Sequence, residues 1–144
     1  MNKLNFTEFK KITLNEKLNN CISLFESYIL KHNLHETKWL IILNFLKESN
    51  RWDYIDEWFY KYCEILPESI LEETDFKSNS EDWKYITIEE FKEYKELYDN
   101  SKYTEEINSL MIHIHQMVSI ELYTDSKKIS KISFAEYSKY IKFI

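Results

Sequence analysis

Four histidines are the residues of this sequence most suited to binding a metal ion. They are His32, His35, His113 and His115. A carboxylate-supported metal site in a helical bundle needs a glutamate three residues before a histidine on two helices, and none of the four has that neighbour. His113 and His115, two residues apart, point to different faces of a helix. The spacing therefore predicts no metal ion and places these side chains at the surface or at the edge of the core.

Nucleophilic catalysis would use Cys21 or Cys63, but both lie on apolar stripes, which is typical of buried free thiols in a reducing compartment. The absence of glycine excludes phosphate-binding loops, dinucleotide-binding turns and the nucleophile elbow of hydrolases. Glu121 falls on an apolar stripe, which predicts an edge position or an ion pair with a lysine or Arg51; a buried catalytic carboxylate stays open as an alternative. We expect no catalytic residue, no cofactor and no enzymatic activity.

The segment RWDYIDEWFYKY, residues 51–62, contains six aromatic side chains. On a helical wheel one sector faces the core, and it holds Trp52, Ile55, Phe59, Tyr62, Cys63 and Leu66. Tyr54 and Trp58 lie four residues apart on a flank beside acidic residues, and Tyr60 lies on the other edge. Tyr54 and Trp58 either pack against the loop at residues 74–86 or belong to a binding surface, because tyrosine and tryptophan commonly anchor interfaces.

Acidic residues are concentrated in the middle of the chain. Residues 53–106 hold 17 acids and 6 bases, although the formal charge of the whole chain is only −6. Such a surface either keeps the protein soluble or attracts a cationic protein partner, and it repels nucleic acid. We predict a partner-binding surface made of the acids and rings of this region. Its residues are Asp53, Tyr54, Glu57, Trp58, Glu64, Glu68, Glu72, Glu89, Glu93 and Glu96.

Basic and apolar segments are short. The one basic cluster, at Lys127, Lys128 and Lys131, is smaller than the face that a DNA-binding protein needs. No apolar segment approaches the length of a membrane span, and the N-terminus lacks the apolar run of a signal peptide. We therefore expect a cytoplasmic protein that binds neither nucleic acid nor membranes.

Apolar residues recur at three- and four-residue intervals, which predicts helices. The predicted helices span residues 14–31, 34–48, 51–65, 88–98, 104–123 and 134–143, with a short helical turn beginning at Pro67 and a polar loop at 74–86. The segment 104–123 is apolar nearly all round, as expected of a helix that others surround. The sequence predicts an all-α, single-domain bundle of about six helices around this central helix.

Helix starts are marked by capping residues. The four-residue stretches that begin at Thr87 and Ser133 have the form of a capping box, in which the first and fourth side chains satisfy each other's backbone N–H groups. Weaker versions begin at Thr13 and Asn33, and Asn50 is a further candidate cap. These residues set the expected positions of the helix N-termini.

The clusters Trp52-Asp53-Tyr54 and Asp56-Glu57-Trp58, followed by the acids between Glu64 and Glu96, resemble the layout of immunity proteins of bacterial toxin systems. The resemblance covers the middle of a small helical chain. It implies an intracellular protein that binds one cognate toxin, often a basic nuclease, and blocks its active cleft. A helical adaptor or homodimeric interaction module is the alternative, and the sequence leaves open both the partner and the oligomeric state.

Overall fold

The computed structural model describes residues 2–73, 76 and 83–144. Regular structure in these residues is entirely helical, which confirms the predicted all-α class. The elements are α1 (Phe6–Phe9), α2 (Leu14–Lys31), α3 (Leu40–Lys47), the short 3-10 helices η1 (Glu48–Asn50) and η2 (Trp52–Tyr54), α4 (Ile55–Ile65), α5 (Pro67–Leu71), α6 (Ile88–Asn100), α7 (Thr104–Tyr123) and α8 (Ile129–Ile141). The predicted inward position of the Trp52 side chain and most of the predicted loop at 74–86 lie outside the described residues.

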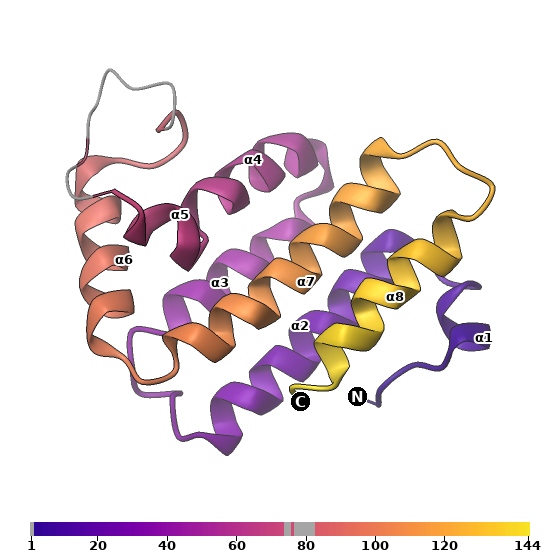
Figure 1. The fold of residues 1–144 in the computed structure, drawn as a ribbon, viewed down its shortest axis with the longest axis horizontal. Helices are drawn as coiled ribbons and strands as arrows, with labels where there is room; N and C mark the ends of the chain where they lie inside the picture. Colours follow the sequence, from indigo (N-terminus) through magenta and orange to yellow (C-terminus); the bar gives the residue numbers. More distant parts are fainter. Residues whose placement is uncertain (1, 74–75, 77–82) are drawn as a thin grey trace.

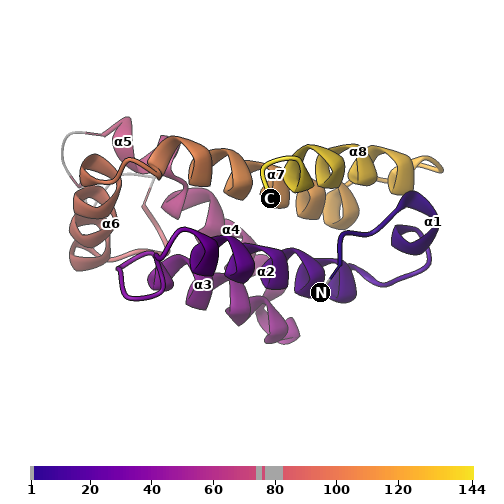
Figure 2. The same cartoon turned by 90° about the horizontal axis from the view of Figure 1, so that it is seen from below.

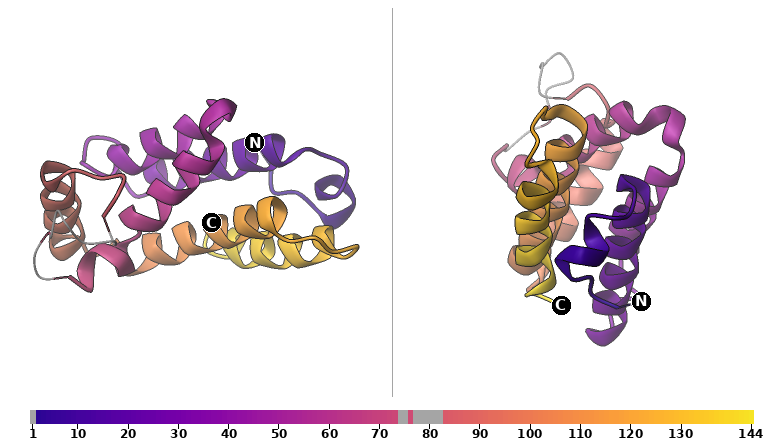
Figure 3. Two further views of the ribbon diagram at one scale, coloured as in Figure 1. Left: turned by 90° about the horizontal axis from the view of Figure 1, so that it is seen from above. Right: turned by 90° about the vertical axis from the view of Figure 1, so that its right-hand side faces the viewer.

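The long helices lie in two layers. Figure 1 and Figure 2 show α7 and α8 side by side in one layer and α2 and α3 in the other, with α4 running obliquely from the α3 side toward α7. α6 stands crosswise at one end of the bundle. α1 lies at the opposite end, where it contacts α8, and Figure 3 shows it beside the space between the layers.

α7 is the central helix, as its sequence predicts. It packs against α2, α4, α5 and α8. Its buried residues are the predicted stripe of Ile107, Leu110, Met111, Ile114, Met117 and Val118. Removal of this apolar surface from water is the main force that holds the two layers together.

Buried tyrosines connect the helices through their hydroxyl groups. Tyr62 of α4 donates to the backbone carbonyl of Met111 in α7 over 2.6 Å, and Tyr140 of α8 donates to the carbonyl of Cys21 in α2 over 2.6 Å. Each ring fills apolar space while its polar atom keeps a partner, so the core accepts these side chains without an unsatisfied hydroxyl.

Two of the predicted helix starts are confirmed as capping boxes. The Thr13 hydroxyl accepts from the backbone N–H of Glu16, and the Glu16 carboxylate accepts from the N–H of Thr13. Thr87 and Glu90 form the same reciprocal pair at the start of α6. These caps fix where α2 and α6 begin.

Asn33 ends a helix, and its predicted role as an N-cap is wrong. Its φ of 57° is left-handed, and the N–H of Leu34 donates back to the carbonyl of Ile29 over 2.8 Å. This is the pattern by which an asparagine closes a helix where glycine is absent. The helix predicted from residue 34 consequently begins only at Leu40.

Ser133 and Asn50 are not N-caps either, contrary to prediction. α8 begins at Ile129, five residues before the predicted start at 134, so Ser133 lies within the helix and is buried. Asn50 belongs to η1, where its side-chain amide donates to the carbonyl of Lys47. In both cases the polar side chain has another partner.

Candidate functional site

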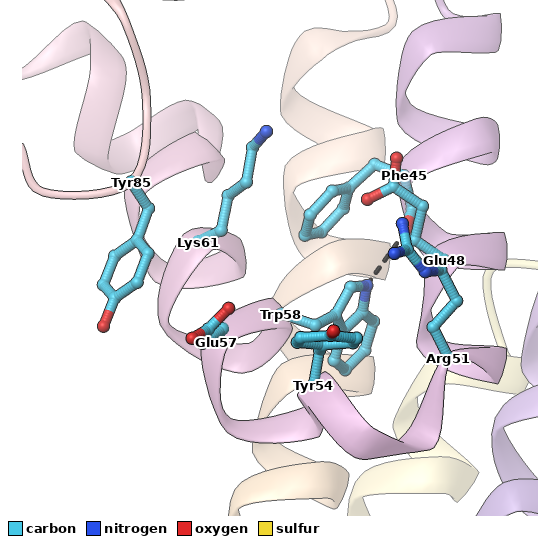
Figure 4. A pocket seen from close by; sticks show the side chains of 8 residues that line it. All are labelled: Phe45, Glu48, Arg51, Tyr54, Glu57, Trp58, Lys61 and Tyr85. Carbon is cyan, nitrogen blue, oxygen red and sulfur yellow. Dashed lines mark hydrogen bonds between the residues drawn. The ribbon is translucent and has the colours of Figure 1, made fainter.

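A cleft of about 400 Å³ lies where the end of α3 and η1 meets the start of α4 (Figure 4). We call it the Tyr54 cleft. It is lined by Phe45, Glu48, Arg51, Tyr54, Glu57, Trp58, Lys61 and Tyr85. The chain turns at Arg51, whose φ of −85° and ψ of 72° are not helical, so that side chains from both arms of the turn face one space.

The floor of the Tyr54 cleft is made by Phe45 and Trp58. Their rings stack with centroids 5.7 Å apart and an interplanar angle of 13°. The Trp58 indole N–H donates to the backbone carbonyl of Phe45 over 2.9 Å, and the residue is only 5% exposed. Trp58 is therefore buried against Phe45 of α3, a packing partner that neither predicted alternative for this ring names.

Tyr54 remains at the surface, with an exposed fraction of 52%. The guanidinium carbon of Arg51 lies 5.3 Å from the centre of its ring, within the range of a cation–π interaction. Figure 4 shows the two side chains at the mouth of the cleft, with Lys61 extending away from them. One face of the Tyr54 ring thus already has a cation beside it.

The charges at the Tyr54 cleft are only partly paired. Lys61 forms an ion pair with Glu90 over 2.9 Å. Glu48 and Glu57 are exposed, and neither forms an ion pair with another residue that the structure describes. Two carboxylates at the cleft are therefore available to a cationic ligand, and the one positive charge there without an ion-pair partner in the described part of the chain is the guanidinium of Arg51.

Three half-exposed tyrosines extend from the cleft, which Tyr85 lines, to the neighbouring surface. We call Tyr60, Tyr85 and Tyr123 the tyrosine ridge. Tyr60 and Tyr85 stack with ring centroids 6.0 Å apart, and Tyr123 donates its hydroxyl hydrogen to the Asp56 carboxylate over 2.6 Å. The pKa of the Tyr123 phenol is raised by partial desolvation and by that hydrogen bond. The sequence did not identify this ridge, because its members come from α4, α7 and the segment before α6.

Glu64 is 9% exposed, so its predicted position on an open surface is wrong. Its carboxylate accepts hydrogen bonds from the backbone N–H groups of Lys84, Tyr85 and Ile86, at 3.0 to 3.3 Å. Ionised carboxylates form strong hydrogen bonds to backbone donors. The role of Glu64 is therefore to hold the segment that carries Tyr85 to the Tyr54 cleft.

The predicted surface is not gathered at one place. Asp53 is exposed on η2, next to Tyr54. The remaining predicted acids are exposed on or beside α5 and α6, and none of them lines the cleft; they are Glu68, Glu72, Glu89, Glu93 and Glu96. Of the predicted residues, the structure brings together Tyr54, Glu57 and Trp58 at the cleft.

Glu121 forms a buried ion pair with Lys17, as one of its predicted alternatives states. The Lys17 ammonium lies 2.8 Å from the carboxylate, and the two side chains are 4% and 10% exposed. The Ser133 hydroxyl donates to the same carboxylate over 2.6 Å. The Glu121 carboxylate thus connects α7 to α2 through Lys17 and to α8 through Ser133, and both of its oxygens accept hydrogen bonds.

Cys63 has a histidine beside it, which the sequence did not reveal. Its Sγ lies 2.9 Å from Nε2 of His115, and the imidazole stacks on Phe59 with centroids 4.4 Å apart. Burial raises the pKa of Cys63 and lowers the pKa of His115 to about 4. Both shifts disfavour the thiolate–imidazolium pair that activates a catalytic cysteine, so the pair is neutral at neutral pH.

The partly buried imidazole of His115 predicts a specific loss of stability in acid. The unfolded chain takes up a proton as the pH falls below 6.5, whereas the folded pKa is about 4, so the contribution is intact above pH 6.5 and is lost between 6.5 and 4. Between about pH 7 and pH 5 this amounts to about 2 kcal/mol. Urea denaturation at both pH values should show a correspondingly smaller loss for His115→Gln than for the wild type. Equal losses of stability in His115→Gln and the wild type would show that protonation of His115 is not the cause.

Among the described residues, no three His, Cys, Asp or Glu side chains are placed to hold a metal ion together. No helix in the described ranges has both the length and the apolar character needed to cross a membrane. Comparison with family models, with characterised proteins and with solved structures gave no match.

Proposed function

We propose that the protein binds a basic protein partner through the Tyr54 cleft and the tyrosine ridge. The observation that supports this most is a half-exposed ring, Tyr54, next to Glu48 and Glu57, which have no ion-pair partner among the described residues. Exposed tyrosines are efficient interface anchors because a large rigid ring is buried at little entropic cost. Unpaired carboxylates around such rings favour a cationic partner over a neutral one.

The partner that this surface fits best is a toxin domain with a basic active cleft, in keeping with the resemblance to immunity proteins. Inhibition would follow from occlusion. The carboxylates at the Tyr54 cleft pair with lysines and arginines of the toxin, while the rings of the ridge exclude water around those pairs. The acids of α6, including Glu89 and Glu93, add a long-range field that accelerates encounter without contacting the partner.

Glu57→Lys should weaken binding of such a toxin by about tenfold or more, since it replaces an attractive charge at the cleft with a repulsive one. Where the gene immediately upstream encodes a secreted protein with a variable C-terminal domain, that domain is the partner to test, by calorimetry and by rescue of growth on co-expression. Glu89→Lys is the matched control, because it makes the same charge change on an exposed residue that does not line the cleft.

Equal effects of the two variants would remove the Tyr54 cleft from the interface. A neighbouring product that is harmless and does not bind the chain would overturn the proposed function itself. Raised salt should slow association more than it speeds dissociation, because screening acts mainly on the encounter.

The tyrosine ridge supports a second candidate, self-association of the chain as an adaptor module. Tyr60, Tyr85 and Tyr123 form an aromatic surface that a second copy would cover. Light scattering distinguishes the two functions directly. A dimer that Tyr60→Ser converts to a monomer would favour the adaptor, whereas a monomer at all concentrations would exclude it.

A further inference from the structure

We propose that the Tyr54 cleft receives an arginine side chain of the partner, in the place that Arg51 occupies in the free protein. This inference rests on the proposed binding of a basic protein and specifies the group that is recognised. Arg51 is the single arginine of the chain, and it lies at the mouth of the Tyr54 cleft.

The geometry shows that the site already accepts a guanidinium. The Arg51 guanidinium carbon stands 5.3 Å from the Tyr54 ring centre, over a ring that is half exposed. A planar guanidinium stacks on an aromatic face better than a compact ammonium does, and it also forms paired hydrogen bonds with carboxylates. The cleft supplies both features, because Glu48 and Glu57 line it together with Tyr54.

Arg51 can be displaced at small cost. It is exposed and forms no ion pair with the residues that the structure describes. Its remaining interaction with Tyr54 is a cation–π contact at an exposed site, which is a weak interaction. An incoming arginine gains the Tyr54 ring and lies at the mouth of a cleft that also carries the carboxylates of Glu48 and Glu57. Like charge then drives Arg51 away from the occupied cleft. Arg51 therefore acts as an internal competitor for the partner's cation.

A short peptide tests this without any partner. The probe is acetyl-Gly-Arg-Gly-amide, followed through the Trp58 indole N–H signal in NMR titrations, and compared with peptides that carry citrulline or lysine in place of arginine. Citrulline keeps the shape of arginine and removes its charge. We expect the arginine peptide to bind about tenfold tighter than the citrulline peptide, and several-fold tighter than the lysine peptide.

Variants of Arg51 and Tyr54 distinguish competition by Arg51 for the cleft from a general effect of the protein's net charge. Arg51→Gln should bind the arginine peptide about threefold or more tighter than the wild type, and Tyr54→Ala should bind it about threefold or more weaker. Lys92→Gln, which removes one positive charge from an exposed position on α6, should leave the affinity within about twofold of the wild type.

Three results would overturn the inference: equal binding of arginine and citrulline peptides, equal binding of arginine and lysine peptides, or no gain for Arg51→Gln over Lys92→Gln. If the toxin domain of the neighbouring gene still binds in that event, the proposed function stands and only the arginine assignment falls. If the arginine peptide binds as expected while the toxin domain does not, the cleft recognises arginine in a different protein.

Discussion

Lys17→Met is expected to destabilise the protein by about 3–5 kcal/mol, because it leaves the Glu121 carboxylate buried without its cation. The ammonium and the carboxylate are 2.8 Å apart and almost inaccessible to water. Lys17 also lies over the ring of Phe9, with 4.3 Å from Nζ to the ring centre, so the same substitution removes a contact that holds α1. Urea denaturation at neutral pH measures the loss.

The double variant Lys17→Met, Glu121→Leu provides the decisive comparison. It removes both charges at once, so no unpaired ion is left inside, and it should be markedly more stable than the single variant. Lys47→Met is the matched control, since its partner Glu26 is nearly half exposed and such pairs contribute about 0–1 kcal/mol. If Lys17→Met costs no more than Lys47→Met, the buried pair does not hold the helices as described.

Trp58→Ala is expected to destabilise the protein by about 3–5 kcal/mol, the usual cost of truncating a large buried aromatic residue. The substitution opens a cavity against Phe45 and removes the hydrogen bond from the indole to the Phe45 carbonyl. Tyr54→Ala, four residues earlier and half exposed, should change stability by less than about 1 kcal/mol.

The contrast between these two substitutions separates folding from binding. Tyr54→Ala should lower the affinity for a cationic ligand in a protein that remains folded. Trp58→Ala should instead lower the fraction of protein that is folded, whether or not a ligand is present. Thermal or urea denaturation of both variants is sufficient. A Trp58→Ala protein as stable as the wild type would show that the ring is not part of the core.

The sequence predicts best those helices that have a long apolar stripe and clear signals at both termini. The predicted spans 14–31 and 104–123 coincide with α2 and α7. Each has an apolar stripe over several turns, so local periodicity and tertiary packing agree. α1 was missed because a helix of four residues has no periodicity to detect, although Asn5 and Glu8 form a capping box there.

Errors arose where a polar side chain has more than one possible partner. Ser133 looks like an N-cap in sequence, but its hydroxyl donates to Glu121, which lies on a different helix. Asn33 looks like the start of one helix and in fact closes another. Sequence spacing gives the direction of a side chain along its own helix. It does not identify the group that faces that side chain from a neighbouring helix.

The candidate site was half predicted for the same reason. The helical wheel placed Tyr54 and Trp58 on one flank, which is correct, but it could not show that α3 covers the second ring and leaves the first exposed. Tyr85 and Tyr123 reach the same surface from other elements, so no local pattern contains them. The sequence groups Glu64 with the surface acids, because its backbone partners lie some twenty residues further along the chain.

The stacking of Trp58 on Phe45 has a consequence for how this protein would diverge. Trp58 belongs to the core and also lines the cleft. Substituting it alone would lower the stability of the protein, so it can change only together with the residues packed against it. Glu48, Tyr54 and Glu57 are under no such constraint. On the proposed function, relatives with different partners should keep the tryptophan–phenylalanine pair and vary these three positions, so that binding specificity changes while the core stays the same.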